Sequence, residues 1–521
     1  MTTSSSRPRR GAHPRVRGAV AGLGAAALLL GTAHLVAAVV GRGSDPFLAV
    51  GDAVVRLSPP ALTSAAIETF GSYDKVVLLA GVAVVLVAVA AASGAVAVSR
   101  LAVGAAVPVL LVLAALVAVL SAPGAGPLDV LPTVAGTLVA VPVFVLLVRA
   151  ARAARAPSDD ADVPAPAVSR RRFVGLAGAV AAVAAGLAGA GTAVASAVRD
   201  AVASREGLRL PAAAEPVGEV PAGARLVDTV PFRTPVDELY RVDTALTVPQ
   251  VRAEDWRLRV HGLVDRPLEL DWDSLTRTYE VVEREITLVC VSNPVGGELA
   301  GNVVWTGVRL ADVLADAGVD PTADMLLSTS VDGWSASTPL EALLGDEDAL
   351  LAFGIDRRPL PFEHGFPVRM VVPGLYGYVS ATKWVVDLEV TRFADDEAYW
   401  TPRGYAAEAP VKTASRIDVP ASFAQLEAGP VVVAGTAWHP ALGIDRVEVR
   451  VDGGEWAEAE LGDVPSVLTW RQWRWEWDAS PGQHRLEVRA TDAAGDTQTD
   501  ERAEVAPDGA TGWHSVAVTV T

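Results

Sequence analysis

The first part of the chain consists of long stretches without a charged side chain. These stretches cover residues 18–41, 76–99, 101–121, 130–148 and 173–198, and each has 19 or more residues. A helix needs about 20 residues to cross a hydrocarbon layer of ~30 Å, and soluble proteins rarely bury helices of that length. The pattern predicts an all-α bundle of four transmembrane helices within 18–148 and a fifth at 173–198. Pro108 is expected to kink the third helix.

Cationic side chains flank these stretches unevenly. The N-terminal basic arm (1–17), Arg100 and the segment 149–172 together hold twelve arginines, whereas the opposite loops hold three cations. Because positive loops stay in the cytoplasm, we expect a multi-pass protein of the cell membrane. Its N-terminus and the 149–172 linker would be cytoplasmic, and everything after the fifth helix would be extracytoplasmic.

The basic linker ends in Ser169-Arg170-Arg171-Arg172-Phe173-Val174-Gly175, just before the fifth apolar stretch. Consecutive arginines before an apolar residue and a Gly/Ala-rich segment are typical of a twin-arginine export signal. The alternative is a basic stop before a membrane helix. Ala195-Ser196-Ala197 offers a cleavage site, but with four helices before it we expect the fifth to remain as an anchor.

A Pro/Ala-rich linker is predicted over 199–235, and the pattern then changes to short alternating segments. Residues 256–260, 286–290, 368–372 and 384–388 are predicted strands, and 310–317 has helical spacing that ends at Gly318. This mixture predicts an α+β domain over 236–395. After a second linker, 396–418, residues 419–521 show short strands with turn signals and no helical stretch. They predict an immunoglobulin-like β-sandwich.

Composition supports a division between lipid and water. The chain has 521 residues, of which 51% are hydrophobic and 20% charged. Residues 1–205 carry 17 Lys and Arg against 9 Asp and Glu, and residues 206–521 carry 26 against 52. Nucleic acid is excluded as a partner, because phosphate neutralisation needs a basic face. One cysteine excludes an intrachain disulfide. His34 is the lone histidine within a predicted span and Cys-x-x-Cys-His is absent, so we expect no haem.

Two segments carry candidate chemistry. Cys290 ends a predicted strand and precedes a polar, glycine-rich loop (291–297), where a thiolate would be a soft metal ligand. The alternative is a small buried hydrophobe.

The second segment contains His364, Arg369 and a glycine-rich run from Pro373 to Trp384. Cations are scarce in this acidic region, so their concentration indicates a bound phosphate. The alternative is a solvated strand end.

These segments, taken with Trp305-Thr-Gly-Val-Arg-Leu310 and Asp332-Gly333, resemble the sulfite oxidase family of molybdopterin-dependent oxidoreductases. The resemblance covers about 235–521, and the C-terminal sandwich is similar to that family's dimerisation domain. The membrane part is not covered. The resemblance implies a molybdenum-molybdopterin cofactor and a possible homodimer through the C-terminal domain.

The resemblance also implies a role for individual residues. Cys290 would be the thiolate ligand of molybdenum, and Tyr405 would lie over its oxo group and relay a proton. The remaining positions would contact the cofactor. His364, Arg369, Ser380 and Lys383 would hold the pterin phosphate, Asp332 would accept hydrogen bonds from the pterin, Ser292 and Asn293 would line the metal loop, and Tyr240, Arg241, Asp243 and Thr244 would form the first contacting loop. An ordinary linker aromatic is the alternative for Tyr405.

Two departures from the family pattern affect the substrate. Sulfite-oxidising members have arginines soon after the cysteine, where this chain has Pro294 and Val295. Their first loop reads Arg-Asn-His, where this chain has Arg241-Val242-Asp243. Each lost charge-assisted hydrogen bond weakens dianion binding by roughly 1.5–3 kcal/mol. Sulfite oxidation and sulfoxide reduction therefore both stay open.

The sequence thus predicts a membrane-anchored, extracytoplasmic enzyme that transfers an oxygen atom to or from a sulfur compound. Electrons would pass to a separate redox partner. A non-catalytic membrane-anchored binding protein with a degenerate cofactor site is the first alternative. A transporter or sensor is the second, although the spans hold few ionisable residues.

Overall fold

The structure is a computed structural model that divides into two compact units, 1–200 and 201–521. It describes residues 14–59, 62, 66, 69, 70, 73–122, 125–153, 167–198, 201–226, 231–344 and 348–521. Most of the basic arm and residues 154–166 of the basic linker lie outside the described residues. Each unit is treated by itself below.

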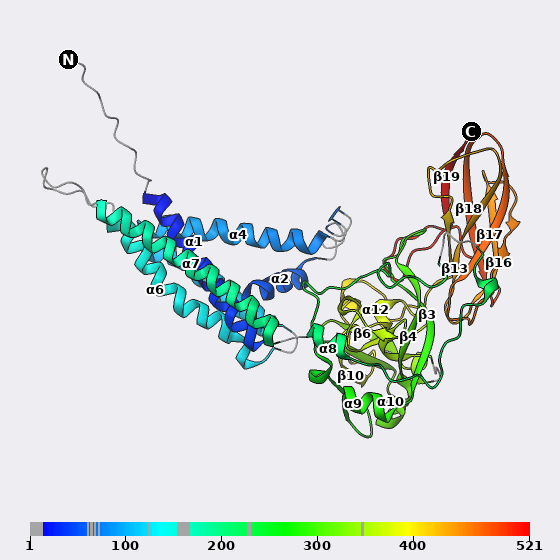
Figure 1. Ribbon diagram of the computed structural model, residues 1–521, viewed down its shortest axis with the longest axis horizontal. Coiled ribbons are helices and arrows are strands. Elements are labelled where there is room, and N and C mark those ends of the chain that lie inside the picture. The colour runs from blue at the N-terminus through cyan, green and yellow to red at the C-terminus, as the bar shows by residue number, and fades with distance from the viewer. Residues whose placement is uncertain are drawn as a thin grey trace, which may run out of the picture. The chain divides into compact units, whose positions relative to one another are not determined.

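The first unit is helical. Its α-helices are α1 (Pro14–Val40), α2 (Pro46–Leu57), α4 (Asp74–Ala97), α5 (Leu101–Leu120), α6 (Leu131–Ala153) and α7 (Ala167–Val198). Five helical stretches, at 14–40, 74–97, 101–120, 127–152 and 171–195, are long and apolar enough to cross a membrane. Helix α1 packs against α4, α6 and α7, as Figure 1 shows for the blue and cyan ribbons.

Small residues let these helices approach closely. A Cβ atom built on Gly22 of α1 would lie 1.9 Å from the carbonyl oxygen of Ala90 in α4, and one on Gly94 would lie 2.0 Å from that of Gly18. Such contacts are typical of helices packed in lipid, where van der Waals contact rather than the hydrophobic effect drives association. Any larger side chain at these glycines would separate α1 from α4.

The second unit begins with two sheets. The first has the order β2 (Leu268–Asp271), β1 (Arg257–Gly262), β10 (Val385–Thr391), β5 (Met325–Ser330) and β6 (Ser335–Pro339), in which β1 and β10 are parallel. The second has the order β3 (Val281–Val289), β4 (Ala300–Arg309), β7 (Leu350–Ile355) and β8 (Arg358–Pro359), with β9 (Arg369–Val371) also paired to β7. Helices α8 (Ala201–Gly207), α9 (Trp272–Thr278), α10 (Leu310–Ala317), α11 (Glu341–Leu344) and α12 (Gly377–Ser380) complete this mixed α and β region.

The segment predicted as a linker, 199–235, is partly built into this region. Helix α8 lies within it, Phe232 is buried, and Thr234 donates from its backbone nitrogen to Asn302 of β4 over 2.7 Å. Arg233 pairs with the buried Glu285 of β3 at 2.9 Å. The Pro/Ala-rich composition misled the prediction, because extended chain can pack on a sheet edge without helical or strand periodicity.

The C-terminal region, 414–521, holds two further sheets that share one apolar core (Figure 1, orange to red). One has the order β11 (Ala414–Val419), β13 (Gly429–Trp438), β17 (Arg471–Ala479) and β16 (Glu460–Leu461). The other has the order β12 (Gln425–Leu426), β19 (His514–Val520), β18 (Gly482–Asp492), β14 (Ile444–Val451) and β15 (Ala457–Glu458). Trp473 and Trp477 of β17 belong to this core.

Candidate active site

Cys290 follows the last residue of β3 and is 8% exposed. Its backbone nitrogen donates to the carbonyl oxygen of Leu299, and its carbonyl oxygen accepts from the nitrogen of Asn293. These two bonds fix the cysteine at the start of a tight loop. Burial raises the pKa of the thiol, whereas hydrogen bonds from Ser292 and the charge of Lys383 oppose that rise.

Three buried phenols lie within electrostatic range of the thiol. Tyr240, Tyr376 and Tyr405 all interact electrostatically with Cys290, although they come from distant parts of the chain. Burial raises the pKa of all three, to about 12 for Tyr376. They therefore stay protonated at neutral pH and can donate hydrogen bonds beside the sulfur. Cys290 and these three tyrosines are called the sulfur half of the site.

Tyr405 is held by aromatic packing. Its ring lies edge-on to Tyr378 at 5.5 Å and to Trp400 at 5.1 Å between ring centroids. Such edge-to-face pairs favour one ring orientation. Tyr405 also interacts electrostatically with Cys290, and its role over the oxo group stays a prediction.

His364, Arg369 and Lys383 form the cation half of the site. Arg369 donates to the carbonyl oxygen of His364 over 3.2 Å, and a Cβ built on Gly365 would lie 3.0 Å from the Cβ of Arg369 and 3.2 Å from that of Lys383. Gly365 has a φ of 108°, a conformation that favours glycine. The missing side chain also lets Arg369 and Lys383 lie close to its backbone. Burial, followed by the nearby cations, lowers the pKa of His364 to about 4.

Arg369 is buried without a balancing carboxylate among the described residues. It is 4% exposed, and its guanidinium donates to the carbonyl oxygens of His364, Met370 and Ala381. The guanidinium also lies 4.9 Å from the ring centroid of Trp305. Burial lowers its pKa to about 10. A buried charge of this kind is costly unless an anion joins it.

Lys383 has a different partner from the one that its predicted role requires. Its Nζ atom donates to Asp243 over 2.7 Å and to the carbonyl oxygen of Glu363 over 3.1 Å. Arg241 pairs with the same carboxylate at 2.8 Å. Burial lowers the pKa of Lys383 to about 8, against the opposing effect of Asp243. Asp243, Arg241 and Lys383 are therefore brought together, and Asp243 balances part of their charge.

Other predicted residues serve local structure. Asn293 accepts from the backbone nitrogen of Leu299 over 2.9 Å, so it closes the cysteine loop. Ser380 donates to the carbonyl oxygens of Leu375 and Tyr376, and exposed Asp332 accepts from the nitrogen of Trp334. Within the described part of the chain, Thr244 makes no side-chain hydrogen bond to another site residue. The cofactor contacts of these four residues stay predictions.

Sequence reasoning missed Tyr376 and Trp305 as site residues. Tyr376 stands in the glycine-rich run, but nothing in that run indicates that its phenol interacts electrostatically with Cys290. Trp305 lies under Arg369, and its buried Nε1 atom has no hydrogen-bond partner among the residues that the structure describes. An aromatic position in a buried strand normally signals core, so only the fold could reveal either contact.

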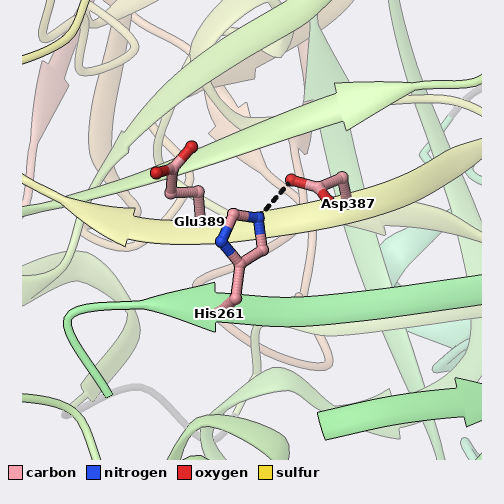
Figure 2. A group of neighbouring side chains, drawn as sticks. All are labelled: His261, Asp387 and Glu389. Carbon is pink, nitrogen blue, oxygen red and sulfur yellow. Dashed lines mark hydrogen bonds and ion pairs between the residues drawn. The ribbon is translucent and has the colours of Figure 1, made fainter. Parts of the chain in front are cut away.

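A second group of potential ligands lies on the first sheet. Figure 2 shows His261 of β1 and Asp387 and Glu389 of β10 turned toward one another, with ligand atoms within 4.8 Å. His261 contacts one oxygen of Asp387 at 2.9 Å, and Arg259 contacts the other at 2.8 Å. Because the carboxylate of Asp387 is already engaged on both oxygens, this group is explained as an ion-pair network between parallel strands.

Comparisons with known proteins identify the family of the chain. The family described as "Oxidoreductase molybdopterin binding domain" matches residues 245–400. The uncharacterized oxidoreductase YuiH of Bacillus subtilis (strain 168) is 35% identical over 150 residues, which cover 29% of this chain and 72% of that protein. The chain belongs to the sulfite oxidase family of molybdopterin-dependent oxidoreductases.

Longer relatives match over part of their length. Mitochondrial sulfite oxidase of Mus musculus is 30% identical over 309 residues, which cover 50% of this chain and 56% of that protein. Nitrate reductase [NADH] of Spinacia oleracea is 26% identical over 333 residues, with 52% and 36% covered. The chain thus spans a little over half the length of the sulfite oxidase and about a third of the nitrate reductase.

A solved structure supports the fold of this sulfite oxidase family member. The sulfane dehydrogenase SoxCD of Paracoccus pantotrophus aligns with a TM-score of 0.50 and 23% identity, over 60% of this chain and 89% of that chain. At this identity the likeness establishes the fold alone. The site residues must therefore be argued from this chain's own contacts.

The residues present fit the family's cofactor. Buried Arg369 lacks a carboxylate partner among the described residues and suits a phosphate. The thiol of Cys290 is a soft ligand at the neighbouring position, electrostatically coupled to Lys383. A molybdenum-bearing pterin has both a metal for the sulfur half and a phosphate for the cation half.

Proposed function

We propose that this protein is a membrane-anchored, extracytoplasmic molybdenum oxidoreductase acting on a sulfur compound, with electrons exchanged with a separate redox partner. The observation that carries the proposal is that the single cysteine interacts electrostatically with three buried phenols. One of them, Tyr240, also interacts with Arg369, which is buried without a carboxylate partner among the described residues. The five apolar helices and their arginine-rich flanks support the anchoring and the orientation.

The chain's own groups would divide the work. Cys290 would hold the metal, and Arg369, His364 and Lys383 would hold the pterin phosphate, with Asp243 released from Lys383 as the phosphate arrives. When bound, the cofactor supplies two-electron oxygen-atom transfer. Tyr405, whose burial raises its pKa, would keep its proton and donate a hydrogen bond to the oxygen being transferred.

The charge of the pocket favours a substrate that is not a dianion. Arg241 is already paired with Asp243 at 2.8 Å, and Pro294 and Val295 offer no charge. Arg471 is a further cation that could bind a dianion, but its guanidinium donates to the carbonyl oxygens of Gly462 and Ile444 and so stabilises the C-terminal sheets. We therefore expect an uncharged sulfoxide to compete well with sulfite.

The C-terminal region is proposed to be an immunoglobulin-like dimerisation domain.

Metal and pterin analysis of protein made in a cofactor-competent host tests the proposal. We expect one molybdenum and one pterin per chain, and turnover of sulfite or of an S-oxide with artificial dyes as electron acceptor or donor. Cys290→Ser should fold and lose turnover. Wild-type protein without molybdenum or pterin would contradict the proposal and favour a non-catalytic binding protein.

A further inference from the structure

The loop that follows Cys290 is held by the C-terminal region of the same chain. Arg416 of β11 donates from Nη1 to the carbonyl oxygen of Gly297 over 2.7 Å. Arg416 is itself fixed by Asp418, which lies 2.5 Å from its Nε atom and accepts from Thr436 over 3.1 Å. Both side chains of the Arg416–Asp418 pair are nearly buried, at 12% and 13% exposure. The bond to Gly297 therefore starts from a rigid support.

His514, the first residue of β19, contacts the same loop. Its Nδ1 atom accepts from the backbone nitrogen of Ile417 over 3.0 Å, so the ring hydrogen is on Nε2. The opposite side of the ring lies against Gly296: a Cβ built there would be 2.1 Å from Cδ2 and 2.3 Å from Nε2 of His514. Gly296 also has a φ of 78°, so this position requires glycine twice over.

A displacement of these glycines would be passed on to Cys290. Gly297 donates to the carbonyl oxygen of Pro294 over 2.9 Å, and Asn293 donates to that of Cys290 over 3.0 Å. The side chain of Asn293 also ties the loop to Leu299, whose carbonyl oxygen accepts from Cys290. A loop with so many internal bonds moves as a unit rather than bending at one residue.

From these contacts we infer that Arg416 and His514 are positioning residues for the Cys290 sulfur. They act through the 291–297 loop, so the C-terminal region is part of the active site of its own chain and not solely a surface for a second copy. The inference deepens the proposed function and rests on it for the metal, but the loop contacts exist in the protein without cofactor.

The single cysteine makes the loop directly measurable. In the cofactor-free full-length protein, the rate of alkylation of Cys290 by iodoacetamide reports how often the loop opens. His514→Asn keeps an acceptor for Ile417 but removes the contact with Gly296. Arg416→Lys keeps a cation for Asp418 but shortens the reach to Gly297. His484→Asn is the matched control, because His484 lies in the same region and, among the described residues, bonds to Asp452 and Ser480 rather than to the loop.

We expect alkylation to be about tenfold faster in each loop variant, the change that follows when local opening loses one hydrogen bond. The control should react at the wild-type rate. In cofactor-loaded protein, the same two variants should shift the molybdenum electron paramagnetic resonance signal, which loss of overall stability would not move. Alkylation rates equal to that of the control would overturn the inference. Wild-type protein that binds no molybdenum would instead overturn the proposed function alone, because the alkylation rates report the loop with or without metal.

Discussion

The sulfur half and the cation half of the site are built on opposite electrostatics. Burial keeps Cys290 and its three neighbouring tyrosines neutral. Burial of Arg369 and Lys383 instead destabilises their positive charges and lowers their pKa values to about 10 and about 8. Both values stay above 7, so both side chains remain charged at neutral pH. A protein tolerates such destabilisation at a site where a ligand removes it.

This difference separates two tasks. The cation half is incomplete without an anion, which fits the fixed end of a cofactor. The sulfur half lacks a fixed charge of its own, so the thiol would lose its proton only to a bound metal cation, and an uncharged substrate suits the remaining space. If this division is correct, substitutions in the two halves should fail in different ways, and the predictions below test it.

The largest expected effect is the loss of turnover in Cys290→Ser. A serine hydroxyl is a much harder ligand than a thiolate, so the metal loses its protein bond. Because the cation half is unchanged, the variant should still contain pterin, as measured by oxidation of the cofactor to its fluorescent product. A Cys290→Ser protein with wild-type turnover would remove the cysteine from its role.

Tyr405→Phe should come next. Loss of a phenol that donates to the reacting oxygen is expected to lower kcat by about 10²-fold, while molybdenum content stays at the wild-type level. Tyr279→Phe is the control, since Tyr279 contacts Asp316 at the surface. An increase in KM alone, with kcat unchanged, would place Tyr405 in substrate binding instead.

Element type was predictable from sequence wherever one physical cause dominates. The helical spacing of 310–317 is confirmed by α10, which has the same bounds and ends at Gly318 with a φ of 72°. The apolar stretches correspond to long helices, because length and hydropathy alone determine them. Helix α2 was missed: it is short and amphipathic, and its start depends on Asp45 capping the nitrogens of Phe47 and Leu48.

Site partners were predictable as residue types but not as pairs. The sequence places Lys383 and Asp243 some 140 residues apart, and nothing in it shows that they meet at 2.7 Å. Likewise, Arg416 lies 119 residues from Gly297, which it contacts. Long-range pairing is decided by the packing of whole sheets, so local patterns cannot reveal which cation a carboxylate will balance.

Arg369→Met should weaken cofactor retention without disturbing the sulfur half. Loss of a charge-assisted hydrogen bond to phosphate is expected to lower pterin affinity roughly 10–100-fold. The empty protein should be more stable than wild type, since methionine fills a similar volume without a buried charge. Thermal unfolding of the cofactor-free proteins measures this, with exposed Arg266→Met as control. Lower stability of the empty variant would show that the arginine is structural.

Asp243→Asn should alter the choice of substrate. The change frees Arg241 and removes a negative charge, so we expect the KM for sulfite to fall about tenfold, the effect of one charge-assisted bond. The KM for an uncharged sulfoxide should stay the same. Asp395→Asn, which removes a surface partner of Arg392, is the control. Equal changes for both substrates would contradict the assignment of charge as the discriminating feature.

The smallest effects concern pH, and there the two halves should have opposite signs. Burial lowers the pKa of Lys383 to about 8 from 10.5, so above pH 8 the unfolded chain binds the extra proton and stability of the empty protein rises with pH. Burial raises the pKa of Cys290 above 9.0, so above that pH the folded chain binds the extra proton and stability falls.

Two variants separate these contributions. Between pH 8 and 9, Lys383→Met should remove a gain of roughly 1 kcal/mol in the free energy of unfolding, since one proton over one pH unit is worth that amount. Above pH 9, Cys290→Ser should remove part of the decline. Urea unfolding of the cofactor-free proteins measures both. If the two variants shift stability in the same direction, the neutral sulfur half and the charged cation half are not electrostatic opposites.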